Sequence, residues 1–158
     1  MIGTVGSKDK AELAKKHGAH HVILYRDEDF AAKVKEITAG NLCAVVYDGV
    51  GKATFPASLD CLRPFGVFAS FGSASGAVEA FNISLLAQKG SLFATRPTLT
   101  TFMADRALAE KMARDLFRVV AGGEVKIRIG QRWPLAEAPQ AHIALEKRET
   151  TGSLLLVP

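Results

Sequence analysis

Cysteine is scarce in this chain of 158 residues, because only Cys43 and Cys61 occur and neither belongs to a C-x-x-C pair or a His/Cys cluster. This scarcity argues against a disulfide framework and against a cysteine-based zinc site. We therefore expect two buried thiols, no metal site, and a reducing, cytoplasmic setting.

Aromatic residues and charge of one sign are also in short supply. Aromatic side chains make up 8% of the chain, and the net charge of +4 arises from basic residues interleaved with acids, as in KDKAELAKK at 8–16. Such interleaving is typical of solvated helix faces, whereas nucleic-acid binding calls for a basic surface with stacking aromatics. We expect no nucleic-acid partner, and RNA binding by a basic surface is the weakest of the alternatives.

Long hydrophobic runs are missing as well. No apolar stretch approaches the roughly 18–20 residues that cross a bilayer. The first ten residues, MIGTVGSKDK, lack the charged segment and apolar core of a secretory signal. We therefore expect no membrane partner. With 48% hydrophobic and 23% charged residues, the composition is that of a globular protein, and the length fits a single domain.

Short apolar runs alternate instead with amphipathic helical patterns. The expected strands are 2–5, 21–24, 43–47, 67–70, 91–95, 125–129 and 153–157. The expected helices are 8–17, one capped by Asp27 or Asp29 with Phe30, Val34 and Ile37 on its apolar face, 55–62, 103–121 and 135–146. This alternation predicts an α/β fold with right-handed crossovers and a doubly wound, mostly parallel sheet.

Three loops follow apolar strands of this predicted sheet: 6–10 (GSKDK), 48–51 (DGVG) and 71–76 (FGSASG). In open α/β folds the carboxyl ends of the strands share one edge, where ligands bind. We expect the three loops to gather there. The strand at 43–47 is wholly apolar, which indicates a sheet covered on both faces. Phe65 and Phe68 are predicted core residues, while Phe71 lies at the ligand edge.

The stretch YDGVG at 47–51 resembles a phosphate loop. Gly49 and Gly51 supply G-x-G, but Thr54 stands where a dinucleotide fingerprint has its third glycine. The stretch is therefore not the phosphate loop, whose turn would place a pyrophosphate on a helix N-terminus. Two interpretations stay open: a plain strand-to-helix turn that uses the freedom of glycine, or a later ligand loop.

Several strings together resemble one known family. They are IGTVGSKDKAELAKKHGAHHVILYRDEDF, VVYDGVG, SLDCLRPFGVFASFGSASG, QKGSLFATRPTL and GSLLLVP. They are similar to the cofactor domain of the zinc-independent, zeta-crystallin-like NADPH:quinone oxidoreductases of the medium-chain dehydrogenase/reductase superfamily. The resemblance implies reduction of a quinone or enone by NADPH without metal, in a homodimer joined near the strand at 91–95.

The resemblance also implies that residues 1–158 are a partial NADP-binding Rossmann domain. The family's first strand, its Gly-rich loop and its N-terminal GroES-like substrate domain have no counterpart here. In the order 3-2-1-4-5-6 the first strand is central, so its neighbours lose a partner. Exposed interior edges invite pairing with another chain. We expect the chain to rearrange locally or self-associate, to bind NADPH poorly, and to be inactive alone.

The resemblance assigns site residues by position. For the 2′-phosphate of NADP(H) these are Gly6, Ser7, Lys10 and Tyr25. For the remainder of the cofactor they are Val50, Phe71, Gly72, Ser73, Thr98, Leu99 and Arg148. No catalytic residue is assigned, because the family transfers a hydride directly between cofactor and substrate.

The preference for NADP(H) also has support from chemistry alone. An NAD site usually has an acid after its second strand, whereas Gly6, Ser7 and Lys8 stand here, with Lys10 close by. A lysine forms strong charge-assisted bonds to phosphate, although Lys8 and Lys10 are equally compatible with a solvated helix face. The alternative function is a noncatalytic nucleotide-binding or oligomerisation module. A hydrolase triad is not expected, because no nucleophile elbow is present.

Overall fold

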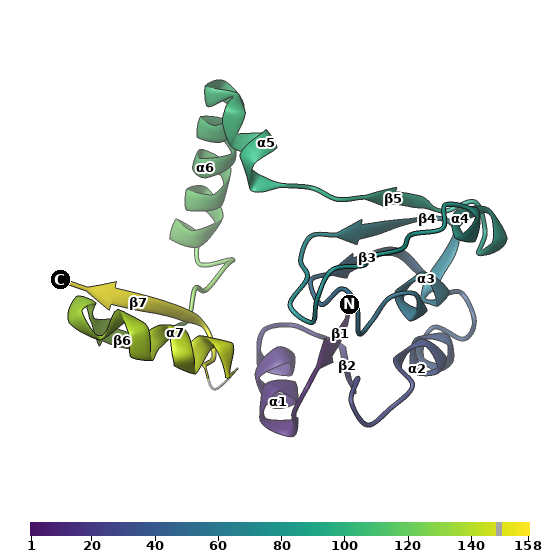
Figure 1. The fold of residues 1–158 in the computed structure, drawn as a ribbon, viewed down its shortest axis with the longest axis horizontal. Helices are drawn as coiled ribbons and strands as arrows, with labels where there is room; N and C mark the ends of the chain where they lie inside the picture. The colour runs from purple at the N-terminus through teal and green to yellow at the C-terminus, as the bar shows by residue number, and fades with distance from the viewer. Residues whose placement is uncertain (148–149) are drawn as a thin grey trace. The chain divides into compact units, whose positions relative to one another are not determined.

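The computed structural model describes residues 1–147 and 150–158, which divide into two compact units, Met1–Leu99 and Thr100–Pro158 (Figure 1). The first unit contains β1 (Ile2–Val5), α1 (Lys8–Lys16), β2 (His21–Leu24), α2 (Phe30–Ile37), β3 (Cys43–Asp48), α3 (Ala57–Asp60), β4 (Leu62–Ser70), α4 (Ser84–Gln88) and β5 (Phe93–Thr95). From Leu99 onward follow α5 (Leu99–Ala104), α6 (Arg106–Ala121), β6 (Ile129–Pro134), a 3-10 turn (Leu135–Glu137), α7 (Ala138–Glu146) and β7 (Ser153–Val157).

The strands of the first unit form two parallel groups. β1 pairs with β2, with Ile2 opposite His21, and β3, β4 and β5 form a second sheet in that order. Each parallel pair is joined by a crossover that contains a helix, as parallel pairing requires. The expectation of an α/β fold with parallel sheets is confirmed.

Helix α2 illustrates how the local sequence positions these layers. The Asp29 carboxylate accepts hydrogen bonds from the backbone N–H groups of Ala31 and Ala32, both at 3.0 Å, and so caps the helix start. Val34, on the apolar face, is buried with Ile23 of β2 and Cys61 in one core cluster. The cap and the apolar spacing together hold α2 against the sheet.

A second cluster of buried residues packs around β4. Leu59, Leu62, Phe68 and Leu92 form it, and Phe55 is among the half-buried residues packed against it. Phe68 is therefore a core residue as predicted. Since these side chains come from both ends of β4 and from its flanking segments, this cluster fixes the β4 strand from which the loop after residue 70 departs.

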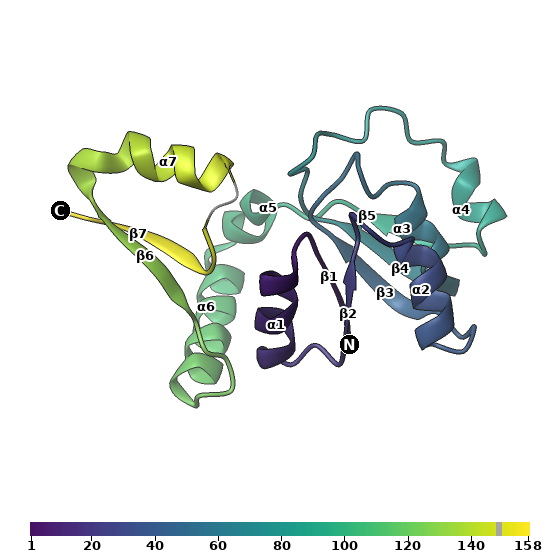
Figure 2. The ribbon, with the colours of Figure 1, turned by 90° about the horizontal axis from the view of Figure 1, so that it is seen from below.

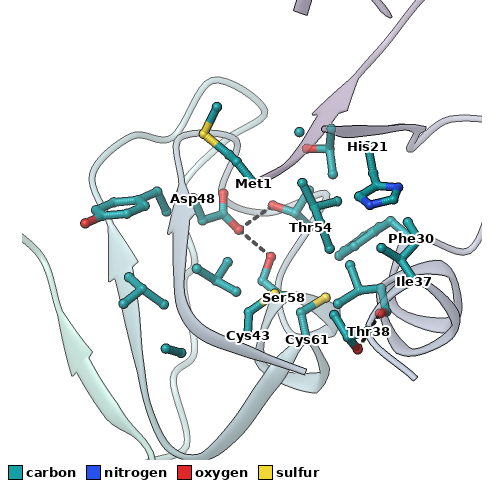
Figure 3. A pocket seen from close by; sticks show the side chains of 18 of the residues that line it. Met1, His21, Phe30, Ile37, Thr38, Cys43, Asp48, Thr54, Ser58 and Cys61 are labelled. Carbon is teal, nitrogen blue, oxygen red and sulfur yellow. Dashed lines mark hydrogen bonds between the residues drawn. The ribbon is translucent and has the colours of Figure 1, made fainter. Parts of the chain in front are cut away.

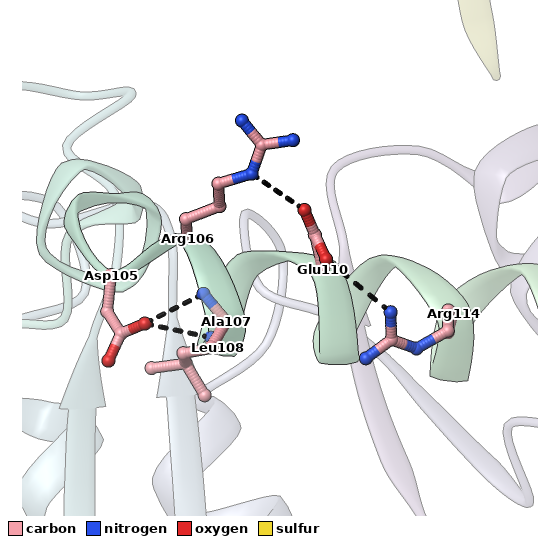
Figure 4. A network of polar contacts seen from close by, with 6 residues as sticks. All are labelled: Asp105, Arg106, Ala107, Leu108, Glu110 and Arg114. Atoms are coloured by element: carbon pink, nitrogen blue, oxygen red, sulfur yellow. Dashed lines mark hydrogen bonds and ion pairs between the residues drawn. The ribbon is translucent and has the colours of Figure 1, made fainter.

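In the second unit, α7 lies along the parallel pair β6–β7 (Figure 2). Asp105 caps α6 by accepting bonds from the N–H groups of Ala107 at 2.8 Å and Leu108 at 3.1 Å (Figure 4). Glu110 contacts Arg106 at 2.8 Å and Arg114 at 3.7 Å on the same helix. These pairs are exposed, so each contributes only a few tenths of a kcal/mol.

Four local predictions are wrong, and two of them lie in the first unit. The helix expected at 55–62 is only Ala57–Asp60, and Leu62–Gly66 belong to β4 instead. Between two pairings, Cys43 with Leu62 and Val45 with Val67, β4 advances five residues while β3 advances two. The surplus forms a bulge in which Phe65 takes φ 61° and is 70% exposed. Phe65 is therefore not a core residue.

The other two wrong predictions concern the second unit. The helix expected at 103–121 is two helices, because the residue at position 105 is an aspartate whose side chain starts a new one. The strand expected at 125–129 lies instead at Ile129–Pro134, where it can pair with β7. No helix in the described part of the chain is long and apolar enough to span a membrane.

Candidate functional site

The loop that follows β3 is organised by one buried carboxylate. Asp48 accepts hydrogen bonds from the N–H groups of Val50 at 2.8 Å and Gly51 at 3.0 Å. It also accepts bonds from the hydroxyls of Thr54 and Ser58, both at 2.7 Å (Figure 3). The carboxylate thus ties the end of β3, the glycine turn and the start of α3 into one network.

Two opposed effects determine the charge state of Asp48, whose residue is only 3% exposed. Burial raises its pKa, but the bonds from Gly51, Ser58, Thr54 and Val50 favour the charged form and outweigh burial. The net pKa of Asp48 lies below its ordinary value. The Asp48 carboxylate is therefore an anion at neutral pH. Its oxygens accept hydrogen bonds within the fold, so it is not available as a base.

The loop at 71–76 is hydrogen-bonded to this first loop. Ser75 donates to the Val50 carbonyl from its N–H at 2.8 Å and from its hydroxyl at 2.7 Å. The Ser75 hydroxyl also accepts from the Ala53 N–H at 2.9 Å, and the Ala74 N–H donates to the Gly49 carbonyl at 3.2 Å. The two predicted ligand loops therefore form one rigid rim at the carboxyl ends of β3 and β4.

Close backbone approach explains two of the glycines in this rim. A Cβ at Gly72 would lie 2.6 Å from the Gly49 carbonyl oxygen, and one at Gly51 would lie 2.5 Å from that of Gly76. Gly51 also takes φ 84°. The Phe71 ring lies over Gly49 and is 57% exposed, so it stays at the rim as expected.

A second group of predicted residues surrounds the end of β1. Ser7 is the N-cap residue of α1 without a side-chain capping bond, and Lys10 lies in the first turn. A Cβ at Gly6 would be 3.3 Å from the Arg26 Nε and 3.4 Å from the Tyr25 hydroxyl. The loops after β1 and β2 therefore bring a glycine backbone, a phenol hydroxyl and a guanidinium together.

The remaining predicted residues are Thr98, Leu99 and Arg148. Thr98 and Leu99 follow β5 and are exposed, and Leu99 begins α5. Arg148 lies outside the described residues. The structure thus places eight of the eleven predicted residues in two groups, Gly6–Tyr25 and Val50–Ser73, each at the carboxyl ends of neighbouring strands.

Two cavities lie in the first unit. The larger, about 780 Å³, lies between β1 and β3 above α2 and is lined by Phe30, Ile37, Cys43, Thr54 and Cys61 among others (Figure 3). The smaller, about 260 Å³, lies beside the ends of β4 and β5 and is lined mainly by Phe55, Phe68, Val78 and Phe81. The Arg96 guanidinium borders it and donates to the Ser70 carbonyl at 2.8 Å.

Both cysteines lie at the larger cavity, and both are free thiols. Cys61 is buried, whereas Cys43 is only half-buried, so the expectation of two buried thiols holds for the first alone. Burial is the main cause that raises the pKa of Cys61 to about 12, and it also raises the pKa of Cys43. Neither thiol has the lowered pKa of a reactive nucleophile.

Sequence reasoning missed three residues of this site: Arg26, Asp48 as a structural anchor, and Arg96. Arg26 follows Tyr25 directly at a strand end, which was a usable signal. Asp48 closes an otherwise apolar strand, and Thr54 and Ser58 follow at positions six and ten residues later. No local pattern marks Arg96, because its partner is 26 residues away.

The parallel strands and their helical crossovers define the class: a Rossmann-like α/β domain. A family model described as zinc-binding dehydrogenase matches residues 17–156. The chain belongs to this family. Among the described residues, no group of three or more His, Cys, Asp or Glu side chains could hold a metal, so no zinc site can be located in them.

Comparison with individual proteins gives the same picture. The chain is 49% identical to a quinone oxidoreductase of Pseudomonas aeruginosa, across all of this chain and 49% of that protein. It is 43% identical to a 2-haloacrylate reductase of a Burkholderia species, of which it spans 48%. The structure of the Escherichia coli quinone oxidoreductase complexed with NADPH matches with a TM-score of 0.93 and 45% identity, over 99% of this chain and 49% of that one. The chain thus spans about half the length of these relatives.

Replacement of Gly72 by alanine tests the close approach of the two loops. Because the new Cβ meets a backbone carbonyl that cannot move aside, Gly72→Ala should lower the free energy of unfolding by about 1–3 kcal/mol. Gly3→Ala is the matched control, since its Cβ would meet the Ala19 side chain at an ordinary 3.6 Å. Equal urea midpoints for the two variants would contradict the close approach of the two loops.

Replacement of Asp48 by asparagine tests the carboxylate network through pH. At pH 7 Asp48→Asn should lower the free energy of unfolding by about 1–3 kcal/mol, since two donors lose an anionic acceptor. The folded pKa is lowered, so this stabilisation is present above the ordinary pKa of about 3.9 and is lost as pH falls through the folded pKa. The difference from wild type should therefore narrow progressively as the pH falls below about 4 and through the lowered pKa of the folded state.

Urea unfolding at several pH values measures this difference. Asp9→Asn is the control, because Asp9 is an exposed carboxylate in the first turn of α1. A difference between Asp48→Asn and wild type that stays constant down to low pH would mean that the ionised carboxylate does not hold the loop.

Proposed function

We propose that this chain forms the NADP(H)-binding part of a reductase that passes a hydride from NADPH to a quinone or enone acceptor. The observation that carries the proposal is the meeting of Gly6, Tyr25 and Arg26 at the carboxyl ends of β1 and β2. The identity with quinone oxidoreductases, one of them solved with NADPH, supports it.

The chemistry of this group fits the 2′-phosphate that distinguishes NADPH from NADH. A guanidinium and a phenol hydroxyl donate hydrogen bonds, and a glycine lets the phosphate approach the backbone. Ser7 and Lys10 add a hydroxyl and an ammonium from the start of α1. None of the residues that meet Gly6 is an acid, so a dianionic phosphate is favoured over ribose hydroxyls.

The rim of the two paired loops is proposed to hold the rest of the cofactor. Val50 would lie beside the adenosine, and Phe71, Gly72 and Ser73 beside the nicotinamide ribose. Thr98 and Leu99 would flank the nicotinamide, and Arg148 would close on the cofactor. The backbone bonds between the loops pre-organise this rim, which lowers the entropy cost of binding.

When bound, NADPH supplies the hydride, so the protein needs no nucleophile. The work of these residues is to bind the phosphate, to orient the ring and to exclude water. Asp48 and the two cysteines are unsuited to acid–base or covalent work, because Asp48 is fully bonded and the thiols have raised pKa values. We propose that the reaction is zinc-independent and cytoplasmic, and that the acceptor is a quinone or an enone-type compound related to 2-haloacrylate.

A noncatalytic nucleotide-binding or oligomerisation module is the second candidate. In the described sheets β1 pairs with β2 alone and β3 with β4 alone, and a large cavity lies between β1 and β3; these open edges favour the second candidate. In this alternative the chain keeps the fold and the phosphate-binding residues around Gly6 but catalyses no reaction.

A homodimer is proposed through the free edge of β5. This strand pairs with β4 alone in the described sheet, and Phe93 is 61% exposed on it. Phe93→Glu should then convert a dimer to a monomer in sedimentation velocity, because a charge at a desolvated contact is unfavourable. A wild-type chain that sediments as a monomer at all concentrations contradicts the dimer.

Titration of the chain with NADPH and NADH tests the phosphate site. Arg26→Ala should weaken NADPH binding by about 10- to 100-fold, the equivalent of one charge-assisted bond of about 1.5–3 kcal/mol, and leave NADH binding unchanged. Lys10→Ala should act in the same direction. Lys16→Ala, an exposed lysine in the last turn of α1, is the matched control.

Thermal unfolding with each nucleotide gives the second readout. A ligand at about one hundred times its Kd adds roughly 2.7 kcal/mol of stability. Equal losses for NADPH and NADH in Arg26→Ala would overturn the phosphate assignment. Binding without hydride transfer to any quinone or enone would favour the noncatalytic module.

A further inference from the structure

The two cysteines of the chain are neighbours in space. Cys43 is the first residue of β3, and Cys61 is the C-cap residue of α3, directly before β4. The Cys43 N–H donates to the Cys61 carbonyl at 2.8 Å. Since this bond joins the two residues directly, standard bond lengths keep their Cα atoms within about 7 Å of each other. Disulfides span about 4.4–6.8 Å between Cα atoms, so the backbone separation suits a bond between the two sulfurs.

The two side chains lie on the same side of the sheet. The Cα partner of Cys43 is Leu62, and in a regular ladder the residue before that partner would point to the opposite face. Cys61, however, takes helical angles, φ −82° and ψ −7°, because α3 ends on it. Its side chain therefore does not follow the alternation of a strand. It belongs to the core cluster against which Cys43 packs, and both residues line one cavity (Figure 3).

The electrostatics of the pair agree with this closeness. Burial is the main cause that raises the pKa of Cys61, and the negative charge of an ionised Cys43 is the next. Burial also raises the pKa of Cys43. Two thiolates are therefore unfavourable here, whereas a disulfide carries no charge and loses little when it is removed from water.

We propose that Cys43 and Cys61 form a modification site at which hydrogen peroxide closes an intramolecular disulfide. One thiolate attacks a peroxide oxygen, the O–O bond breaks, and a sulfenic acid and one water form. The other thiolate then attacks the sulfenic sulfur, the S–S bond forms as the S–O bond breaks, and a second water leaves. Together the two thiols give up two electrons and two protons, and the peroxide is reduced to two waters.

The surroundings of the pair make the first step slow and the second fast. The raised pKa of each thiol leaves little thiolate at neutral pH, so a sustained excess of oxidant is needed. Hydrogen peroxide is small and uncharged, so an apolar surrounding does not exclude it as it would a charged oxidant. Once one sulfur is oxidised, the neighbouring thiol is already in place, which favours the disulfide over further oxidation of the first sulfur.

The disulfide encloses the segment that organises the candidate site. Residues 44–60 lie between the two cysteines and include Asp48 together with its four hydrogen-bond donors. A crosslink across this segment restricts the unfolded chain and so stabilises the folded one. The only hydrogen bond given up is weak, since the Cys61 S–H donates to the Ala57 carbonyl at 3.7 Å. We therefore expect the oxidised chain to resist unfolding better than the reduced chain.

Thiol counting and peptide mapping on the wild-type chain test the bond itself. The chain is treated with hydrogen peroxide, the reaction is stopped with catalase, and the protein is unfolded in the presence of N-ethylmaleimide. Both thiols should become unreactive together, and the chain should remain single on a denaturing gel without reductant. A tryptic peptide that contains Cys43 should be joined to the one that contains Cys61, two hydrogens lighter than the pair. Dithiothreitol should restore both thiols.

Urea unfolding tests the consequence of the bond. Oxidation of the wild-type chain should lower its unfolding equilibrium constant by about 100-fold, the effect expected for a closed loop of this length, and reduction should reverse it. Cys43→Ala is the matched control, because it cannot form the bond but keeps all three methionines, which peroxide also oxidises. Its urea midpoint should not rise with peroxide. Cys61→Ala serves in the same way, and peptide mapping of wild type decides the proposal even if neither variant folds.

Four outcomes overturn the proposal. They are two intact thiols after prolonged treatment, one sulfinic acid beside an intact thiol, crosslinks only between chains, and equal urea midpoints for oxidised and reduced wild type. The proposed reductase function is tested separately, because nucleotide binding is measured on the reduced chain. A disulfide without NADPH binding would leave the modification site and refute that function, and NADPH binding without a disulfide would do the reverse.

Discussion

The buried carboxylate of Asp48 is the constraint on which the candidate site depends. A carboxylate removed from water is costly unless its oxygens are hydrogen-bonded, and here four donors meet that requirement. Those donors come from the turn, from Thr54 and from α3, so satisfying one charge fixes three pieces of backbone. The Val50 carbonyl and the Gly49 carbonyl are thereby held where Ser75 and Ala74 of the next loop can bond to them.

This coupling explains why the ligand edge is stiff although it consists of loops. The loops after β3 and β4 share backbone hydrogen bonds in place of bonds to water, and glycines allow the close approach. A stiff rim suits a protein whose part in the reaction is to orient a cofactor, because hydride transfer depends on placement more than on reactive side chains. The residues around Gly6, which we propose as the 2′-phosphate site, come from the loops after β1 and β2.

The strands of the first unit form two separate sheets, β1–β2 and β3–β4–β5. Parallel strands are stable when both edges are paired and both faces are covered. In the described sheets β1 and β3 each have one unpaired edge.

The sequence by itself determined the strand–helix alternation, a helix cap at Asp27 or Asp29 and the loops at strand ends, because these follow from local spacing and side-chain chemistry; the structure selects Asp29. The family resemblance, carried by whole strings of residues, was also readable. Only the tertiary structure decided the bulge that expels Phe65, the break at Asp105, the register of β6, and the pairing of Arg96 with Ser70 across 26 residues. The break at Asp105 comes from a local cap, whereas the other three depend on which distant backbone groups meet. Local periodicity carries no information on such long-range pairing, and it is pairing that fixes register and bulges.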